Sequence, residues 1–148
     1  MRLLAAASVG LLMGMRVLAD QPETFPYKFL MTPEAGPLDP LLEMRYTAQF
    51  SACQARAVST QANEACFAIE FARQDKVLNR KWRSTLARIA PQLHGHLVAA
   101  QRKWIAERDP FCNSKADKFR EGTIAPIIYL DCRVEQTIRR TMWLEQLR

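Results

Sequence analysis

After residue 40, apolar residues recur every three or four positions along most of the chain, with polar residues between them. That spacing is typical of amphipathic helices, which bury one stripe of side chains against a core. No stretch alternates apolar and polar residues for long, and no hairpin turn signal is present. The pattern therefore predicts an all-α domain with about four helices in a small bundle.

Capping residues predict where the first two helices begin. Asp39-Pro40 places an N-cap residue before a proline at the first helical position, so a first helix is expected to reach about Arg56. Ser59 or Thr60 is then expected to cap a second helix that ends near Ile89.

The second half of the chain holds two more predicted helices, separated by a polar stretch. Pro91 interrupts the second helical pattern and can open a third helix. Residues 112–125 are polar and predict a loop, after which Pro126 can open a last helix that reaches about Leu147.

Each of the three long predicted helices carries one inner face. The residues expected to line these faces are Phe71, Leu78, Trp82, Leu86, Ile89, Leu93, Leu97, Ala100, Trp104, Arg108, Ile127, Leu130, Val134, Ile138 and Met142. Because the three tryptophans sit at helical spacing with other apolar residues, we expect them in the core rather than in a ligand platform. Arg139 and Arg140 are expected on a solvated helix face.

Residues 1–19 have the pattern of a secretory signal peptide. Arg2 precedes an apolar run without acidic residues, and small or branched residues precede a cut before Asp20. A membrane anchor or a core helix is the alternative, but the run is short for a bilayer span. Residues 20–40 hold five of the eight prolines, which predicts an extended arm over 20–39 and a helical domain over 40–148.

The formal net charge of +6 falls to +4 when the predicted signal peptide and its two arginines are removed (6 − 2). That charge is too small and too scattered to indicate nucleic-acid binding. It suits contact with an anionic polymer of the cell envelope. The signal peptide predicts a periplasmic or secreted protein.

Four cysteines lie in the predicted mature part: Cys53, Cys66, Cys112 and Cys132. An even number in an exported protein favours two disulfides, for which three pairings exist. The local pairing, Cys53–Cys66 and Cys112–Cys132, closes two short loops, and each bond would contribute about 3 kcal/mol. A metal site is the weaker alternative, because the sequence has no CxxC and no tight Cys/His cluster.

No catalytic motif stands out, and no cofactor or metal is expected. The chain has no glycine-rich phosphate loop, no GxSxG and no HExxH. Its only histidines, His94 and His96, would point in different directions on a helix, so we expect two partly exposed side chains there.

One charged residue, Asp75, falls on the apolar face of the second predicted helix. A buried charge needs a partner, so we expect a structural polar network on this part of the domain. Its predicted members are Asp75, Asn79, Gln101 and Arg108. The alternative is that Asp75 is a catalytic carboxylate.

A series of spaced residues carries the most specific signal in the sequence. It comprises Cys53, Glu64-x-Cys66, Asp75-x-x-Leu78-Asn79, Gln101-Arg102-x-Trp104-Ile105-x-x-Arg108-Asp109-x-x-Cys112, Gly122-Thr123, Cys132 and Thr137-x-Arg139. In order and spacing, this series resembles the lysozyme inhibitor LprI-like N-terminal domain family of secreted bacterial proteins.

The resemblance covers about residues 50–147 and implies a small, exported helical domain stapled by two disulfides in the local pairing. It implies no catalytic residues. The chain departs from the family in three ways: it lacks a lipid-anchor cysteine, it has Trp82 where Tyr is common, and it carries the proline-rich arm.

Two kinds of binding function follow as hypotheses. The first is a non-enzymatic envelope protein that inhibits lysozyme, with Lys115, Lys118 and Arg120 offering cations to the carboxylates of the enzyme cleft. The second is an envelope module that binds a protein or an anionic polymer. A cell-wall glycan hydrolase is least favoured, because no spacing singles out a carboxylate pair among Glu107, Asp109, Glu121 and Asp131.

Overall fold

The computed structural model describes residues 40–147, so the predicted signal peptide (1–19) and arm (20–39) lie outside the described residues. Between residues 40 and 147 the chain forms α-helices and two short 3-10 helices, with no strand. The elements are α2 (Pro40–Glu43), α3 (Ala48–Gln54), α4 (Thr60–Arg88), η1 (Pro91–Leu93), α5 (His94–Ala116), η2 (Asp117–Phe119) and α6 (Ala125–Gln146). The predicted all-α class is confirmed.

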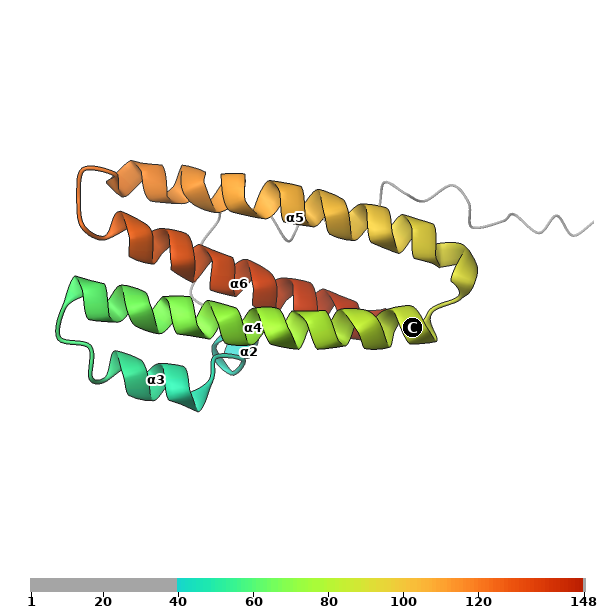
Figure 1. Ribbon diagram of the computed structural model, residues 1–148, viewed down its shortest axis with the longest axis horizontal. Helices are drawn as coiled ribbons and strands as arrows, with labels where there is room; N and C mark the ends of the chain where they lie inside the picture. Colours follow the sequence, from blue (N-terminus) through green and yellow to red (C-terminus); the bar gives the residue numbers. More distant parts are fainter. Residues whose placement is uncertain (1–39, 148) are drawn as a thin grey trace, which may run out of the picture.

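The three long helices lie side by side, with α6 packed against both α4 and α5 (Figure 1). α4 and α6 run in the same direction, and α5 runs against them (Figure 1). The α3–α4 turn (residues 55–59) and the α5–α6 turn (residues 117–124) therefore lie at the same end of the bundle. We call this the disulfide end, and the end where α4 connects to α5 the opposite end.

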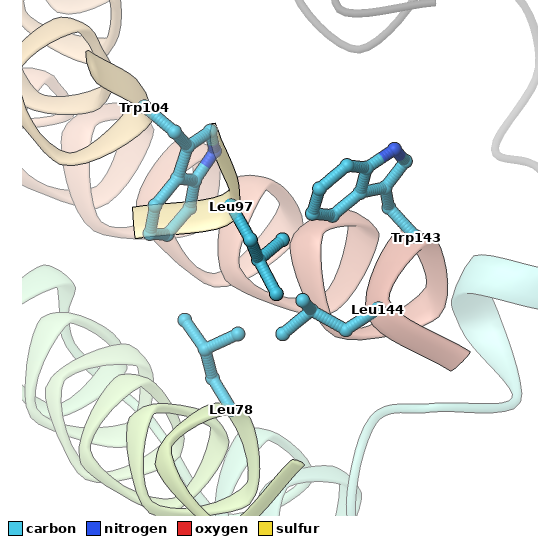
Figure 2. Packing of buried hydrophobic residues seen from close by; sticks show 5 residues of the cluster. All are labelled: Leu78, Leu97, Trp104, Trp143 and Leu144. Atoms are coloured by element: carbon cyan, nitrogen blue, oxygen red, sulfur yellow. The ribbon is translucent and has the colours of Figure 1, made fainter. Parts of the chain in front are cut away.

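The apolar core confirms most of the predicted inner faces. One cluster joins all three long helices near the opposite end, and Figure 2 shows its buried members: Leu78, Leu97, Trp104, Trp143 and Leu144. A second cluster, formed by Leu42, Val134 and Ile138, packs α2 against α6. Leu93 is the clear exception, because η1 leaves its side chain 47% exposed.

The single helix predicted from residue 40 to about Arg56 is wrong, because the chain breaks between Glu43 and Ala48. Thr47 becomes the N-cap of α3, and its hydroxyl accepts a hydrogen bond from the Phe50 amide. The Thr47 amide and hydroxyl both donate to the buried Glu70 carboxylate on α4, at 3.0 and 2.6 Å. Such tertiary hydrogen bonds compensate for the helical bonds that are lost at the break.

The loop predicted over residues 112–125 begins too early, because α5 continues through Pro110 to Ala116. Cys112 and Ala116 are buried, whereas Asn113 and Ser114 are exposed, so these polar residues form the outer face of a helix. The true α5–α6 turn is residues 117–124, and it begins with η2. The helices predicted from Ser59 and to about Leu147 are confirmed as α4 and α6.

A candidate binding surface at the disulfide end

Both disulfides have the local pairing, Cys53–Cys66 and Cys112–Cys132. The first joins α3 to α4 and the second joins α5 to α6, and each closes a loop with one of the two turns at its apex. Cys66, Cys112 and Cys132 are buried. These covalent links hold the bases of both turns in place.

The α5–α6 turn exposes apolar side chains that a small domain would ordinarily bury. Phe119 and Ile124 are each 46% exposed. They line a shallow hollow of about 460 Å³ together with the rest of the turn. The Gly122 amide donates to the Phe119 carbonyl at 2.9 Å, so the turn has an ordered backbone.

The three predicted partner-binding cations surround this turn. Lys115 lies in the last turn of α5, is half-buried, and places its ammonium 5.3 Å from the centre of the Phe111 ring. Lys118 and Arg120 are exposed on the turn itself, and neither forms an ion pair with another residue in the described part of the chain. The turn also carries the exposed acids Asp117 and Glu121, so it combines apolar area with solvent-facing side chains of both charges.

The predicted polar network is divided among separate partners in the structure. Asp75 accepts a hydrogen bond from Asn79, one turn further along α4, at 2.9 Å. Gln101 accepts from the Nε of Arg140 on α6 at 2.8 Å. The four residues do not form one network, because α6, which the spacing along α4 and α5 could not place, supplies the partner for Gln101.

Arg108, the fourth predicted member, belongs to a different arrangement that we call the arginine–aromatic stack. Its members alternate between aromatic rings and guanidinium groups: Tyr129, Arg133, Phe71, Arg108, Trp104, Arg140 and Trp143. The shortest distances from guanidinium carbon to ring centre are 3.8 Å for Arg140 over Trp143 and 3.9 Å for Arg133 over Phe71. Arg108 lies 5.2 Å from both of its rings.

The stack corrects the expectation that Arg140 is solvated, because this side chain is only 1% exposed. Asp109 supports the stack by accepting a hydrogen bond from Arg108 at 2.8 Å and pairing with the Nε of Arg133 at 3.2 Å. The run from Gln101 to Cys112 thus contributes to this stack and to a disulfide.

The structure shields two carboxylates, Glu70, which the sequence analysis did not identify, and Asp131, which it named only as a possible hydrolase carboxylate. Glu70 is fully buried and accepts hydrogen bonds from Thr47 and from Gln74, the latter at 2.7 Å. The signal that could have found it is the pair Glu70 and Gln74, which are one helical turn apart and precede Leu78 on the same face.

Asp131 is the second such carboxylate, and it lies one residue before Cys132. The Tyr46 hydroxyl donates to its Oδ1 at 3.1 Å. Burial, and then the nearby Glu135 charge, raise the pKa of Asp131 to about 6. Burial and the Asp131 charge also raise the pKa of Tyr46.

Within residues 40–147, no group of three or more His, Cys, Asp and Glu side chains could hold a metal ion. The His94 Nε2 lies 3.2 Å from the Ile89 carbonyl oxygen, close to the α4–α5 connection, and His96 is exposed. No described helix has the length and apolar character that crossing a membrane requires.

These features define a class of small, disulfide-linked helical domains in which two disulfide-closed turns with exposed apolar and cationic side chains lie at one end. The sequence matches the model of the family named Lysozyme inhibitor LprI over residues 52–144. Because the match covers more than half of the chain, this protein belongs to that family. Neither the curated proteins nor the solved structures gave a match.

Proposed function

We propose that this protein is an exported, non-enzymatic inhibitor of a lysozyme, and that the α5–α6 turn enters the cleft of that enzyme. Membership of an inhibitor family supports an inhibitory rather than a catalytic role. Two disulfides support an oxidising location in the periplasm or outside the cell. The predicted signal peptide over residues 1–19 agrees with export.

The observation that carries the proposal is the composition of the α5–α6 turn. Glycosidases of the lysozyme type hold two carboxyl groups beside the glycosidic bond that they cleave. Lys118 and Arg120 can offer charge to such groups, while Phe119 and Ile124 can bury apolar area against the cleft walls. A turn fixed by a disulfide loses little conformational freedom on binding.

Titration of the oxidised protein, residues 20–148, into a lysozyme activity assay tests the proposal. Two enzymes should be compared, a strongly basic one and one of lower charge, because long-range repulsion would weaken binding of a protein with net charge +4 (6 − 2) to the basic enzyme. We expect dose-dependent inhibition. An absence of inhibition of both enzymes at tens of micromolar would contradict the proposal.

Charge reversal at the turn separates specific inhibition from a general charge effect. The variant K118E/R120E should weaken inhibition at least tenfold. The matched control K76E/R80E makes the same charge change at exposed positions of α4. These positions lie about 24–30 Å along the helix from its first residue. Equal weakening by both variants would indicate a diffuse electrostatic attraction, as expected for binding to an anionic polymer.

A further inference from the structure

The α3–α4 turn has the same construction as the α5–α6 turn, although no sequence feature pointed to it. It carries Val58, which is 97% exposed, and the exposed cation Arg56. The Cys53–Cys66 disulfide closes the loop that contains both residues. Ser59 ends the turn as the N-cap of α4, since its hydroxyl accepts from the Ala62 amide at 3.1 Å.

The two turns lie at the same end of the bundle (Figure 1). α4 and α6 are packed neighbours that run in the same direction, and each follows directly from one turn (Figure 1). Packed helices lie about 8–10 Å apart, axis to axis. One partner can therefore contact both turns without any rearrangement of the domain.

The two turns share exposed apolar side chains and exposed cations, and the α5–α6 turn additionally exposes the acids Asp117 and Glu121. Val58 on one turn and Phe119 and Ile124 on the other are large apolar residues open to solvent. Arg56 on one turn and Lys118 and Arg120 on the other are exposed cations. Apolar anchors beside charged groups are typical of the centre and rim of protein interfaces, whereas an anionic polymer would require the charges alone.

We infer that the α3–α4 turn and the α5–α6 turn act as one binding surface, and that Arg56 and Val58 provide a second contact with the same carboxylate-lined enzyme. This inference rests on the proposed inhibitory function. The α5–α6 turn supplies the residues that enter the cleft, and the α3–α4 turn contacts the rim beside it. Because a disulfide holds each turn, the two contacts keep a fixed separation, which favours simultaneous binding.

The test compares matched double variants of the full oxidised mature protein in the lysozyme assay. R56E/V58D changes the α3–α4 turn. R83E/L93D makes the same kinds of change at exposed residues of the opposite end, in α4 and η1. We expect R56E/V58D to raise the inhibitory concentration at least tenfold and R83E/L93D to change it less than twofold.

The single variant V58S guards against a folding defect, because it removes apolar area at a fully solvated position without adding charge. It should weaken inhibition three- to tenfold while leaving the melting temperature within about 1 °C of the parent. The inference is overturned if R56E/V58D inhibits like the parent while K118E/R120E does not. In that case only the α5–α6 turn binds, and the proposed function still stands.

Two other outcomes also overturn the inference. If R56E alone weakens inhibition and V58S has no effect, the turn acts through charge only and does not make an apolar contact. If the parent protein inhibits neither lysozyme, the proposed function fails, and the shared surface for that enzyme fails with it.

Discussion

At the opposite end of the bundle, buried apolar side chains hold the three long helices together. At the disulfide end, two disulfides link the helices in pairs, α3 to α4 and α5 to α6. The opposite end holds Trp104, Trp143 and Leu144 in one cluster, with Trp82 and Leu86 packed against it. The disulfide end exposes Val58, Phe119 and Ile124, and the α4–α5 connection at the opposite end exposes Leu93. A domain of this size has little apolar area to spare, so covalent links can replace burial where apolar side chains are kept at the surface.

The largest effect is expected from the apolar cluster at the opposite end. W104A should lower the free energy of unfolding by about 3–5 kcal/mol, because it removes a side chain that is 1% exposed and leaves a cavity. Urea unfolding followed by circular dichroism measures this loss. The neighbouring control I105A, at a 51% exposed position, should cost less than about 0.5 kcal/mol. Similar losses in both variants would contradict this account of the core.

Removal of either disulfide should have the next largest effect. The disulfides Cys112–Cys132 and Cys53–Cys66 close loops with sequence separations of 20 and 13. Each double variant, C112S/C132S or C53S/C66S, should therefore lower the free energy of unfolding by about 3 kcal/mol. Hydrogen exchange should show that protection falls first at the disulfide end. An equal loss of protection at both ends would show that the bonds stabilise the bundle as a whole.

The ionisation of Asp131 offers a smaller and pH-dependent effect. The pKa of this carboxyl rises from the ordinary 3.8 to about 6 in the folded protein, so the folded state binds its proton more readily than the unfolded state. The protonated Asp131 carboxyl therefore stabilises the folded state at pH 4, and this stabilisation is lost as the pH rises through about 6.

The variant D131N measures this contribution, since an amide keeps an acceptor for Tyr46 without the charge. At pH 8 it should stabilise the protein by about 1–2 kcal/mol, which is less than a full shift of two pKa units would give because some water still reaches the carboxyl. At pH 4 it should change little. Chemical denaturation at both pH values provides the test, with E121Q in the exposed turn as the control. Destabilisation by D131N at pH 8 would contradict the assignment.

The smallest effect is expected at the exposed ion pair between Arg45 and Glu145. Two hydrogen bonds join the side chains, at 2.9 and 3.1 Å, but both are partly solvated. R45Q should cost less than about 1 kcal/mol, and salt should diminish the difference. A loss above about 2 kcal/mol would show that this surface contact contributes as much as the interior does.

Local signals were sufficient for much of the fold. Ser59 as a helix cap, Pro91 near the start of a helical segment and the burial of Leu78 and Val134 all follow from interactions within a few residues. The candidate surface was found only in part. Lys118 and Arg120 were identified by their charge, but Phe119 and Val58 were not, because an isolated apolar residue in a turn gives no sign of its exposure.

The sequence by itself determined the helical class and most of the apolar faces, and the resemblance to a known family implied the local disulfide pairing that the structure shows. Only the tertiary structure decided that Arg140 is buried, that Glu70 interrupts the first helix by binding Thr47, and that two turns far apart in the chain share one end. The reason is the range of the interactions. Periodicity and capping act over about four residues, whereas these three features depend on which helices pack together and in which direction.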